Sequence, residues 1–175
     1  MKFTVENISY LERFKQKFLL RFLIVIACTL VIYFQGNDQD FALGIILILG
    51  ILFGISAHIS SSQYFYHVEL ANAKVILKGD YIGNPLQVEL PIRETEISFV
   101  RKGNREIKIN YFVKLQHQAE SYQINRFFNW DYAELVGFFK AYKDLKKEKI
   151  AFDEEEFLKE INQKIEDSKR WIKEP

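Results

Sequence analysis

The sequence predicts a membrane-anchored α+β protein: a helical hairpin of two spans, a domain of antiparallel strands closed by a helix, and a further C-terminal helix. Three observations predict this fold class. Two long apolar runs lie near the start of the chain. The apolar period then changes to two residues, as in half-buried strands, and later to 3.6 residues, as in amphipathic helices. The expected divisions are residues 1–17, 18–59, 60–149 and 150–175.

The two apolar runs, residues 18–34 and 41–59, are each long enough to cross a bilayer. A hydrocarbon core of roughly 30 Å needs about 17–25 mostly apolar helical residues. Because so few residues separate the runs, the two helices form a hairpin and the chain returns to its starting side. The first run has no small-residue cleavage site at its end, so a cleaved signal peptide is not expected.

The basic residues around the first run predict its orientation. Five of them stand before this run or within its first turn: Lys2, Arg13, Lys15, Lys17 and Arg21. The residues that connect the two runs carry two acids and no Lys or Arg. Since Lys and Arg near span ends stay on the cytoplasmic side, both termini are expected in the cytoplasm.

Small residues in the two runs predict close helix packing. Gly50 and Gly54 form a G-x-x-x-G pattern, which lets two helix backbones approach closely. Folding the chain back about the middle of the connection brings Gly50 to nearly the depth of Ala27 and Cys28. Contact within the hairpin is one interpretation, and dimerisation through the two glycines is the other. Cys28 is the single cysteine, so no internal disulfide can form.

Six short strands are expected between residues 60 and 130. The clearest has apolar residues at alternate positions, namely Ile107, Ile109, Tyr111, Val113 and Leu115. Turn signals separate the strands, the strongest at residues 83–85 (Gly-Asn-Pro) and 102–104 (Lys-Gly-Asn). Short strands at about ten-residue spacing with tight turns predict an antiparallel sandwich or barrel.

Two helices are expected after the strands. Asp131 and Glu134 form a capping box for the first. Its apolar stripe is expected to be buried against the strand of Tyr111 and Val113, and it consists of Leu135, Phe138, Phe139, Tyr142 and Leu145. The second, within residues 150–175, is amphipathic and can pack on the domain or on a partner.

Three stretches carry a resemblance to a known family. They are residues 3–14 (FTVENISYLERF), residues 78–85 (KGDYIGNP) with 90–92 (LPI), and residues 111–115 (YFVKL) continuing to the helix at Asp131. With the order of elements, they resemble small bacterial membrane proteins that have a pleckstrin-homology-like domain, the YcxB-like group. The resemblance covers residues 1–149. It implies a bacterial inner-membrane location, and a seven-stranded pleckstrin-homology-like fold in which residues 2–5 are the candidate seventh strand.

The composition and motifs exclude several classes of function. The formal net charge is +1, without the basic excess of a nucleic-acid-binding surface. The three histidines have no metal-ligand spacing, and no nucleophile elbow or glycine-rich phosphate loop occurs. We therefore expect no catalytic residue, no cofactor, no metal and no nucleic-acid partner.

The candidate binding residues are four bases near the turn at residues 102–104: Arg101, Lys102, Arg105 and Lys108. Anionic lipid attracts such residues by about 1 kcal/mol each near the membrane surface. A solvated hairpin tip is the alternative interpretation, because Glu106 lies among them.

The sequence as a whole predicts a non-enzymatic adaptor or scaffold in the inner membrane. The resemblance implies that its cytoplasmic domain binds a protein partner, a second copy of itself in a homodimer, or anionic lipid headgroups. The alternative is a regulatory or assembly subunit of a larger membrane complex, with the hairpin as its interaction surface. An enzyme is not expected, because the spans lack the polar or acidic groups that chemistry would need.

Overall fold

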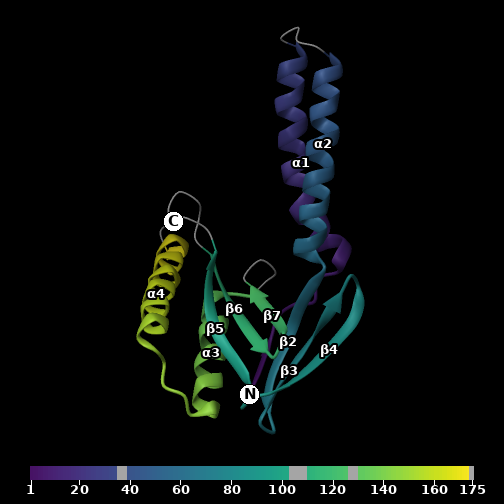
Figure 1. Ribbon diagram of the computed structural model, residues 1–175. Helices are drawn as coiled ribbons and strands as arrows, with labels where there is room; N and C mark the ends of the chain where they lie inside the picture. The colour runs from purple at the N-terminus through teal and green to yellow at the C-terminus, as the bar shows by residue number, and fades with distance from the viewer. Residues whose placement is uncertain (35–38, 103–109, 126–129, 174–175) are drawn as a thin grey trace. The chain divides into compact units, whose positions relative to one another are not determined.

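The computed structural model describes residues 1–34, 39–102, 110–125 and 130–173, without the side chains of residues 20, 21, 32–34, 39–43, 102, 125 and 168–173. The described residues form seven strands and four helices, an α+β fold (Figure 1). In chain order they are β1 (Lys2–Thr4), α1 (Tyr10–Phe34), α2 (Gln39–Ser61), β2 (Gln63–Ala71), β3 (Lys74–Tyr81), β4 (Asn84–Pro91), β5 (Thr95–Lys102), β6 (Asn110–His117), β7 (Glu120–Asn125), α3 (Tyr132–Lys146) and α4 (Phe152–Lys173).

The chain divides into two compact units. The helical unit comprises residues 7–64 and 79–85, and the sheet unit comprises residues 1–6, 65–78 and 86–175. The helical unit therefore holds α1, α2 and the β3–β4 turn, while the strands β2, β3 and β4 have residues in both units.

The strands form two antiparallel sheets, with the orders β1-β2-β3-β4 and β5-β6-β7. The N-terminal segment joins the first sheet, because β1 pairs with β2 and sets Phe3 opposite Val68. β2 to β7 correspond to the six expected strands. The expected turn at residues 102–104 and the start of the strand at 107–109 lie outside the described residues, apart from the backbone of Lys102. The turn expected at residues 83–85 is formed by Ile82 and Gly83 instead, and β4 already begins at Asn84.

Helix α3 closes the core of the sheet unit. The predicted capping box is confirmed, since the side chains of Asp131 and Glu134 each accept a hydrogen bond from the other residue's backbone N–H. The ring of Phe139 lies 4.6 Å from that of Phe99 on β5. Tyr142 donates to the carbonyl of Ile92 (3.0 Å) and to that of Thr95 (2.7 Å). These contacts fix α3 against β5 and the turn that precedes it.

One residue that was predicted to lie in the buried apolar stripe of α3 is exposed. Leu135, Phe138, Phe139 and Tyr142 are fully buried, but the prediction for Leu145 is wrong, because it is 53% exposed. The last turn of α3 instead directs Lys146 to the sheet, where its ammonium donates to the carbonyl of Thr95 (2.8 Å). The backbone then leaves the helix at Lys147 in a left-handed conformation.

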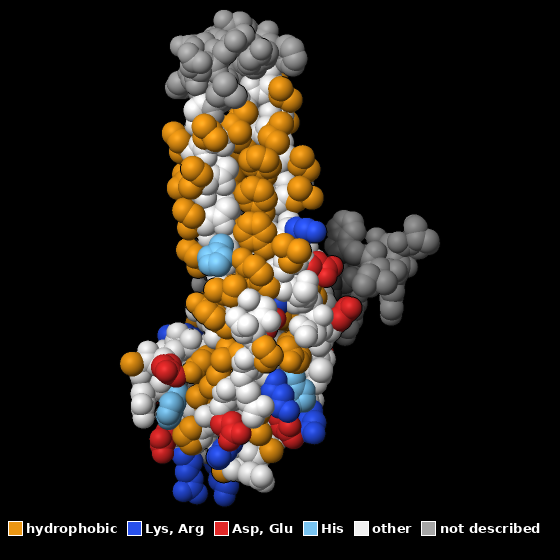
Figure 2. Space-filling view, turned by 90° about the vertical axis from the view of Figure 1, so that its right-hand side faces the viewer, with side chains coloured by type: hydrophobic (Ala, Val, Ile, Leu, Met, Phe, Trp, Pro, Cys, Tyr) orange, Lys and Arg blue, Asp and Glu red, His pale blue; other side chains and the backbone are white. Residues whose placement is uncertain are grey.

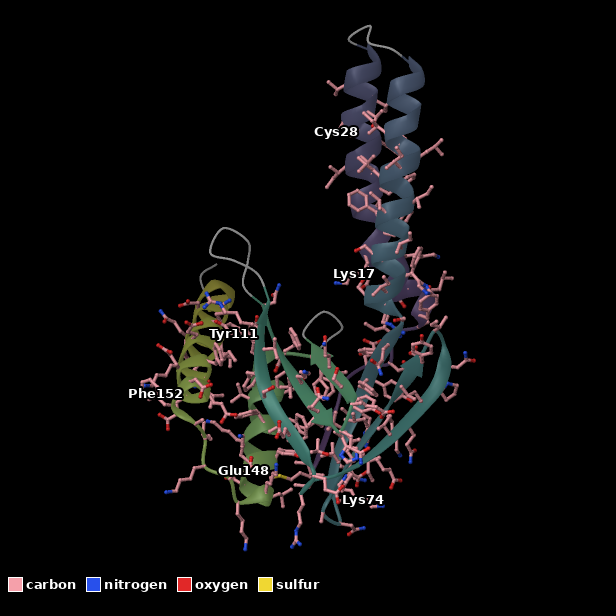
Figure 3. The ribbon with its side chains drawn as sticks, viewed as in Figure 1. Lys17, Cys28, Lys74, Tyr111, Glu148 and Phe152 are labelled. Atoms are coloured by element: carbon pink, nitrogen blue, oxygen red, sulfur yellow. The ribbon has the colours of Figure 1, made fainter. Side chains whose placement is uncertain are left out.

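Helix α4 packs on the sheet unit. Leu158 and Ile161 are buried, and Phe157 lies 6.1 Å from the ring of Tyr111. Tyr111, on β6 (Figure 3), donates a hydrogen bond to Glu160. Burial first, and then the Glu160 carboxylate, raises the pKa of Tyr111 to about 12. Of the two interpretations of the tail helix, packing on the domain is therefore the one observed.

The helices α1 and α2 lie side by side in the helical unit (Figure 1). α1 begins at Tyr10, eight residues before the expected start of the first span. Among the described residues, one helical segment is long and apolar enough to cross a membrane, Gly44–Ser61 of α2, and 11% of it is buried. Several side chains of the first run are not described, so the two-span hairpin stays a prediction. Hydrophobic side chains cover much of this helix pair in Figure 2, whereas charged side chains gather over the strands.

Candidate functional site

The helical unit contains a buried ionic cluster at the start of α1 and the end of α2. We call it the Arg13 cluster: Ile8, Arg13, Ser61, Tyr64 and Asp80. Arg13 is fully buried, and Asp80 nearly so. The guanidinium forms a two-pronged pair with the Asp80 carboxylate, Nη1 to Oδ2 at 2.7 Å and Nη2 to Oδ1 at 2.5 Å.

The remaining donors of Arg13 bind backbone carbonyls. Nε and Nη2 donate to the carbonyl of Ser61 at 3.3 and 3.0 Å, and Nη1 also donates to the carbonyl of Ile8. With the two bonds to Asp80, all five N–H groups of the guanidinium are used. The guanidinium carbon Cζ lies over the Tyr64 ring, 4.8 Å from its centre, a cation–π contact. No donor of Arg13 is left to bind a substrate or a headgroup. The cluster therefore stabilises the fold of the helical unit.

Local sequence signals determine where the two charged residues, Arg13 and Asp80, lie on their elements. Ser9 accepts a hydrogen bond from the backbone of Glu12 and so begins α1, which sets Arg13 in the first turn of that helix. Asp80 stands near the end of β3, where its Oδ1 also accepts from the backbone N–H of Gly83 at 3.2 Å. One carboxylate therefore holds both the guanidinium and the turn that follows it.

The turn between β3 and β4 is held to the end of α2. The backbone N–H of Ile82 donates to the carbonyl of Ser62 at 2.7 Å. A Cβ placed on Gly83 would lie 3.8 Å from the Cβ of Tyr10, the first residue of α1. Tyr10 Oη in turn lies 2.8 Å from His58 Nδ1 on α2. The turn and the adjacent ends of both helices thus form one connected structure.

The two glycines of the G-x-x-x-G pattern face aromatic rings of α1. A Cβ on Gly50 would lie 3.2 Å from Phe22, and one on Gly54 would lie 3.8 Å from Phe18. These phenylalanines belong to an i, i+4 series in which successive rings are 4.9–6.2 Å apart: Tyr10, Phe14, Phe18 and Phe22. We call this series the aromatic ladder. The contact of the two glycines in this structure is therefore within the helix pair.

The predicted packing of Gly50 near the depth of Ala27 and Cys28 stays a prediction. Ala27 and Cys28 are exposed in this structure, and the residue that lies against Gly50 is Phe22, more than one helical turn earlier on α1. The ring of Phe22 fills the space beside Gly50, as the close packing of protein interiors requires.

The four candidate lipid-binding bases are described only in part. Arg101 is exposed on β5, opposite Tyr111 of β6. Lys102 ends β5, and its side chain is not described. Arg105 and Lys108 lie outside the described residues. Whether the four bases gather on one surface stays a prediction.

A second ionic group joins α3 to α4 in the sheet unit. Lys143 lies 2.9 Å from Glu154 and 3.5 Å from Glu148, and Lys146 lies 2.8 Å from Glu148. The hydrogen bond from Lys146 is the main cause that holds the pKa of Glu148 below its ordinary value. All four side chains are paired with each other, so this group serves to fix the α3–α4 connection.

Sequence reasoning identified Arg13 only as one of the basic residues that set orientation, and it missed the pairing with Asp80. The two residues are 67 positions apart, and no local pattern links them. The nearest signal is the spacing of Asp80 and Gly83, which is typical of an Asp-stabilised turn. Within the described part of the chain, no group of three or more His, Cys, Asp or Glu side chains is able to hold a metal ion.

Comparison of the chain with protein-family models, curated proteins and solved structures gives no match. The resemblance to the YcxB-like group therefore stays a prediction.

Proposed function

We propose that the protein is a non-enzymatic scaffold anchored in the bacterial inner membrane by the α1–α2 hairpin, with its sheet unit and both termini in the cytoplasm. The observation that carries this proposal is the apolar surface of the helix pair. Many of its large apolar side chains are 48–67% exposed, among them Leu19, Leu23, Ile24, Leu30, Val31, Leu47, Ile48, Ile51, Leu52, Ile55 and Ile59. A continuous apolar surface of this kind needs a cover, and lipid is the cover that suits a pair of helices of this length.

We also propose that the sheet unit has a pleckstrin-homology-like fold. What supports this is the division into four and three antiparallel strands followed by a helix that closes the core. The pairing of β1 with β2 supplies the seventh strand that the family resemblance requires. A scaffold role follows by analogy with such domains, and it is consistent with an Arg13 cluster whose donors are all used within the protein.

Membrane anchoring is tested by alkaline extraction of membranes that carry the full chain. The wild type should stay in the membrane pellet. Changing Leu47 and Ile51 together to Arg should release it, because each Arg near a span centre costs about 2.5–3.5 kcal/mol on the insertion scale. Leu145→Arg is the matched control, since Leu145 is similarly exposed but lies on α3. Extraction of the wild-type chain, or equal retention of all variants, would contradict the proposal.

The ligand of the scaffold is tested by native mass spectrometry of the full chain released from mild detergent. If anionic headgroups bind, phosphatidylglycerol adducts should persist and should disappear when Arg101, Lys102, Arg105 and Lys108 are all changed to Gln. Adducts that are unchanged in this variant would remove these bases from the proposal. A stoichiometric integral membrane protein in the same spectra would favour the role of an assembly subunit instead.

A further inference from the structure

The turn between β3 and β4 has a residue that does not suit its backbone. Ile82 and Gly83 form a two-residue loop with φ of +52° and +81°. Loops with two positive φ values favour Asn and Gly, which accept this conformation at little cost. A β-branched residue does not, so Ile82 is a backbone outlier. The other non-glycine residues with positive φ in the described chain are not β-branched: Asn72, Ala73, Gln118 and Lys147.

Burial in the protein does not explain this choice of residue. Ile82 is 37% exposed, and the adjacent Tyr81 is 53% exposed. The turn therefore presents two large apolar side chains to the surroundings at a position where a polar residue would fit the backbone better. A backbone outlier whose side chain is not buried in the core points to a role outside the core.

The position of the turn indicates what covers it. The hydrogen bond from Ile82 to Ser62 holds the turn beside the end of α2 within the helical unit, and a Cβ on Gly83 would lie 3.8 Å from the Cβ of Tyr10 at the start of α1. Ser62 lies three residues after Ile59, the last strongly exposed apolar residue of α2. At 1.5 Å per helical residue, this places Ile82 about 5 Å beyond the apolar surface of α2. The headgroup layer on each side of a bilayer core is about 5–7 Å thick, so the turn, counted from the end of the apolar surface of α2, falls within it.

We propose that Tyr81 and Ile82 insert into the headgroup–acyl boundary of the bilayer that α2 crosses. Tyrosine is enriched at this level because its ring is apolar and its hydroxyl stays hydrated. The Arg13–Asp80 pair holds the turn in place, so the insertion requires no rearrangement of the chain. The inserted turn gives the helical unit a third membrane contact and restrains the tilt of the helix pair. This inference rests on the proposed membrane anchoring.

The test measures the depth of single labels on the full chain in liposomes. In a Cys28→Ala background, the variants Ile82→Cys, Ala73→Cys and Ile51→Cys carry an environment-sensitive fluorophore. Quenching is measured with lipids that carry a nitroxide at a shallow or a deep position, and with iodide in the water. Ala73 is the matched control, since it also has positive φ in an exposed turn but lies at the other end of β3.

We expect the label at position 82 to be quenched by the shallow nitroxide several-fold more than the label at position 73, and to be less accessible to iodide. If position 51 is quenched by the deep nitroxide but position 82 by neither lipid, the turn proposal is overturned and membrane anchoring stands. If position 51 is not quenched by lipid either, the anchoring itself fails. A label at position 82 that is shielded from iodide without lipid quenching would mean that protein covers the turn, which also overturns the proposal.

A second variant separates membrane insertion from a structural role. Ile82→Asn suits the positive φ, so the full chain in detergent should unfold at the same or a higher temperature. A label introduced by Tyr81→Cys should then lose most of its shallow quenching. A purely structural role for Ile82 predicts the reverse, a lower unfolding temperature with the quenching retained.

Discussion

Arg13 and Asp80 form a buried ion pair whose main effect is to position the β3–β4 turn. Taking two charges out of water costs several kcal/mol each, and the attraction between them repays this only when the geometry is good and the other donors are satisfied. Both conditions hold here, because the pair is two-pronged and the remaining donors reach the carbonyls of Ile8 and Ser61. The pair therefore specifies where the β3–β4 turn lies on the helical unit.

Removing one partner of this pair should be far more harmful than removing both. Asp80→Ala leaves the guanidinium buried without its counter-ion, and should lower the free energy of unfolding in detergent by about 3–5 kcal/mol. Arg13→Lys should also destabilise, since an ammonium cannot reproduce the planar fork of donors. Lys15→Met, an exposed change on the same helix, is the control.

The double variant Arg13→Met with Asp80→Leu should recover most of this loss, because it removes both buried charges and keeps apolar volume. Urea or thermal unfolding of the purified chain compares the stability of these four variants with that of the wild type. Asp80→Ala behaving like Lys15→Met would mean that the pair is not buried in solution.

The limits of sequence prediction are clearest at this scale. The capping box of Asp131 and Glu134 was predictable, since both residues belong to one helical turn and the motif is local. The pair of Arg13 and Asp80 was not, because the contact depends on how α1, α2 and β3 come together. For Gly50, the sequence predicted close helix packing, and the structure sets the ring of Phe22 against it. A count of residues along the chain does not show how far a phenylalanine ring reaches, so the ring that faces Gly50 was not predictable.

In the helix pair, large side chains of α1 pack against glycines of α2. The aromatic ladder of α1 lies against the glycines of α2, so the rings fill the groove that Gly50 and Gly54 leave. In a bilayer, helices gain little from burying apolar surface against each other, and close packing supplies the association. The ladder also lets successive rings contact each other along one face of α1.

A methyl group at Gly50 should disturb this packing. Gly50→Ala places a Cβ 3.2 Å from Phe22, so that ring must move. The expected loss is about 1–3 kcal/mol, the usual cost of overpacking. Gly44→Ala is the matched control, since a Cβ there meets nothing within 4 Å, and it should be neutral or slightly stabilising. Thermal unfolding in one detergent compares the two, and equal melting temperatures would contradict the packing described.

Two residues of α3 provide a second matched pair. Phe139→Ala should cost about 3–5 kcal/mol, because it removes a fully buried ring that contacts Phe99. Leu145→Ala should change stability by less than about 0.5 kcal/mol, as is usual for an exposed position. Denaturant unfolding followed by tryptophan fluorescence measures both, since Trp130 is buried in the same unit. A loss below 1 kcal/mol for Phe139→Ala would mean that α3 is not part of the core.

The element scale was the most predictable from sequence. The change of apolar period from two to 3.6 gave the strands and α3, because each face of such an element either packs or stays solvated. The exception, Leu145, fits the helical stripe but falls in the last turn, where Lys146 contacts the sheet instead. The apolar periodicity of a helix shows which face is buried. It does not show where along the helix the contact with the neighbouring sheet ends.

The topology of the whole molecule has a direct test. The excess of Lys and Arg before the first run predicts that both termini are cytoplasmic. A reporter that is active only outside the cytoplasmic membrane should be inactive when fused after Pro175, and active when inserted between residues 37 and 38 of the connection. Strong activity of the C-terminal fusion would overturn the topology. A fusion partner that fluoresces only in the cytoplasm gives the complementary readout at both sites.

The pairing of β1 with β2 has a consequence for biosynthesis. β1 leaves the ribosome before either helix, but the strand that it pairs with follows both, and Thr4 and His67 are 63 positions apart. At 5–20 residues per second, β1 waits roughly 3–13 s for its neighbour. During this interval its backbone groups have no partner strand from this chain. The first sheet therefore cannot close until the ribosome has delivered both α1 and α2, so completion of the sheet is a late event in folding.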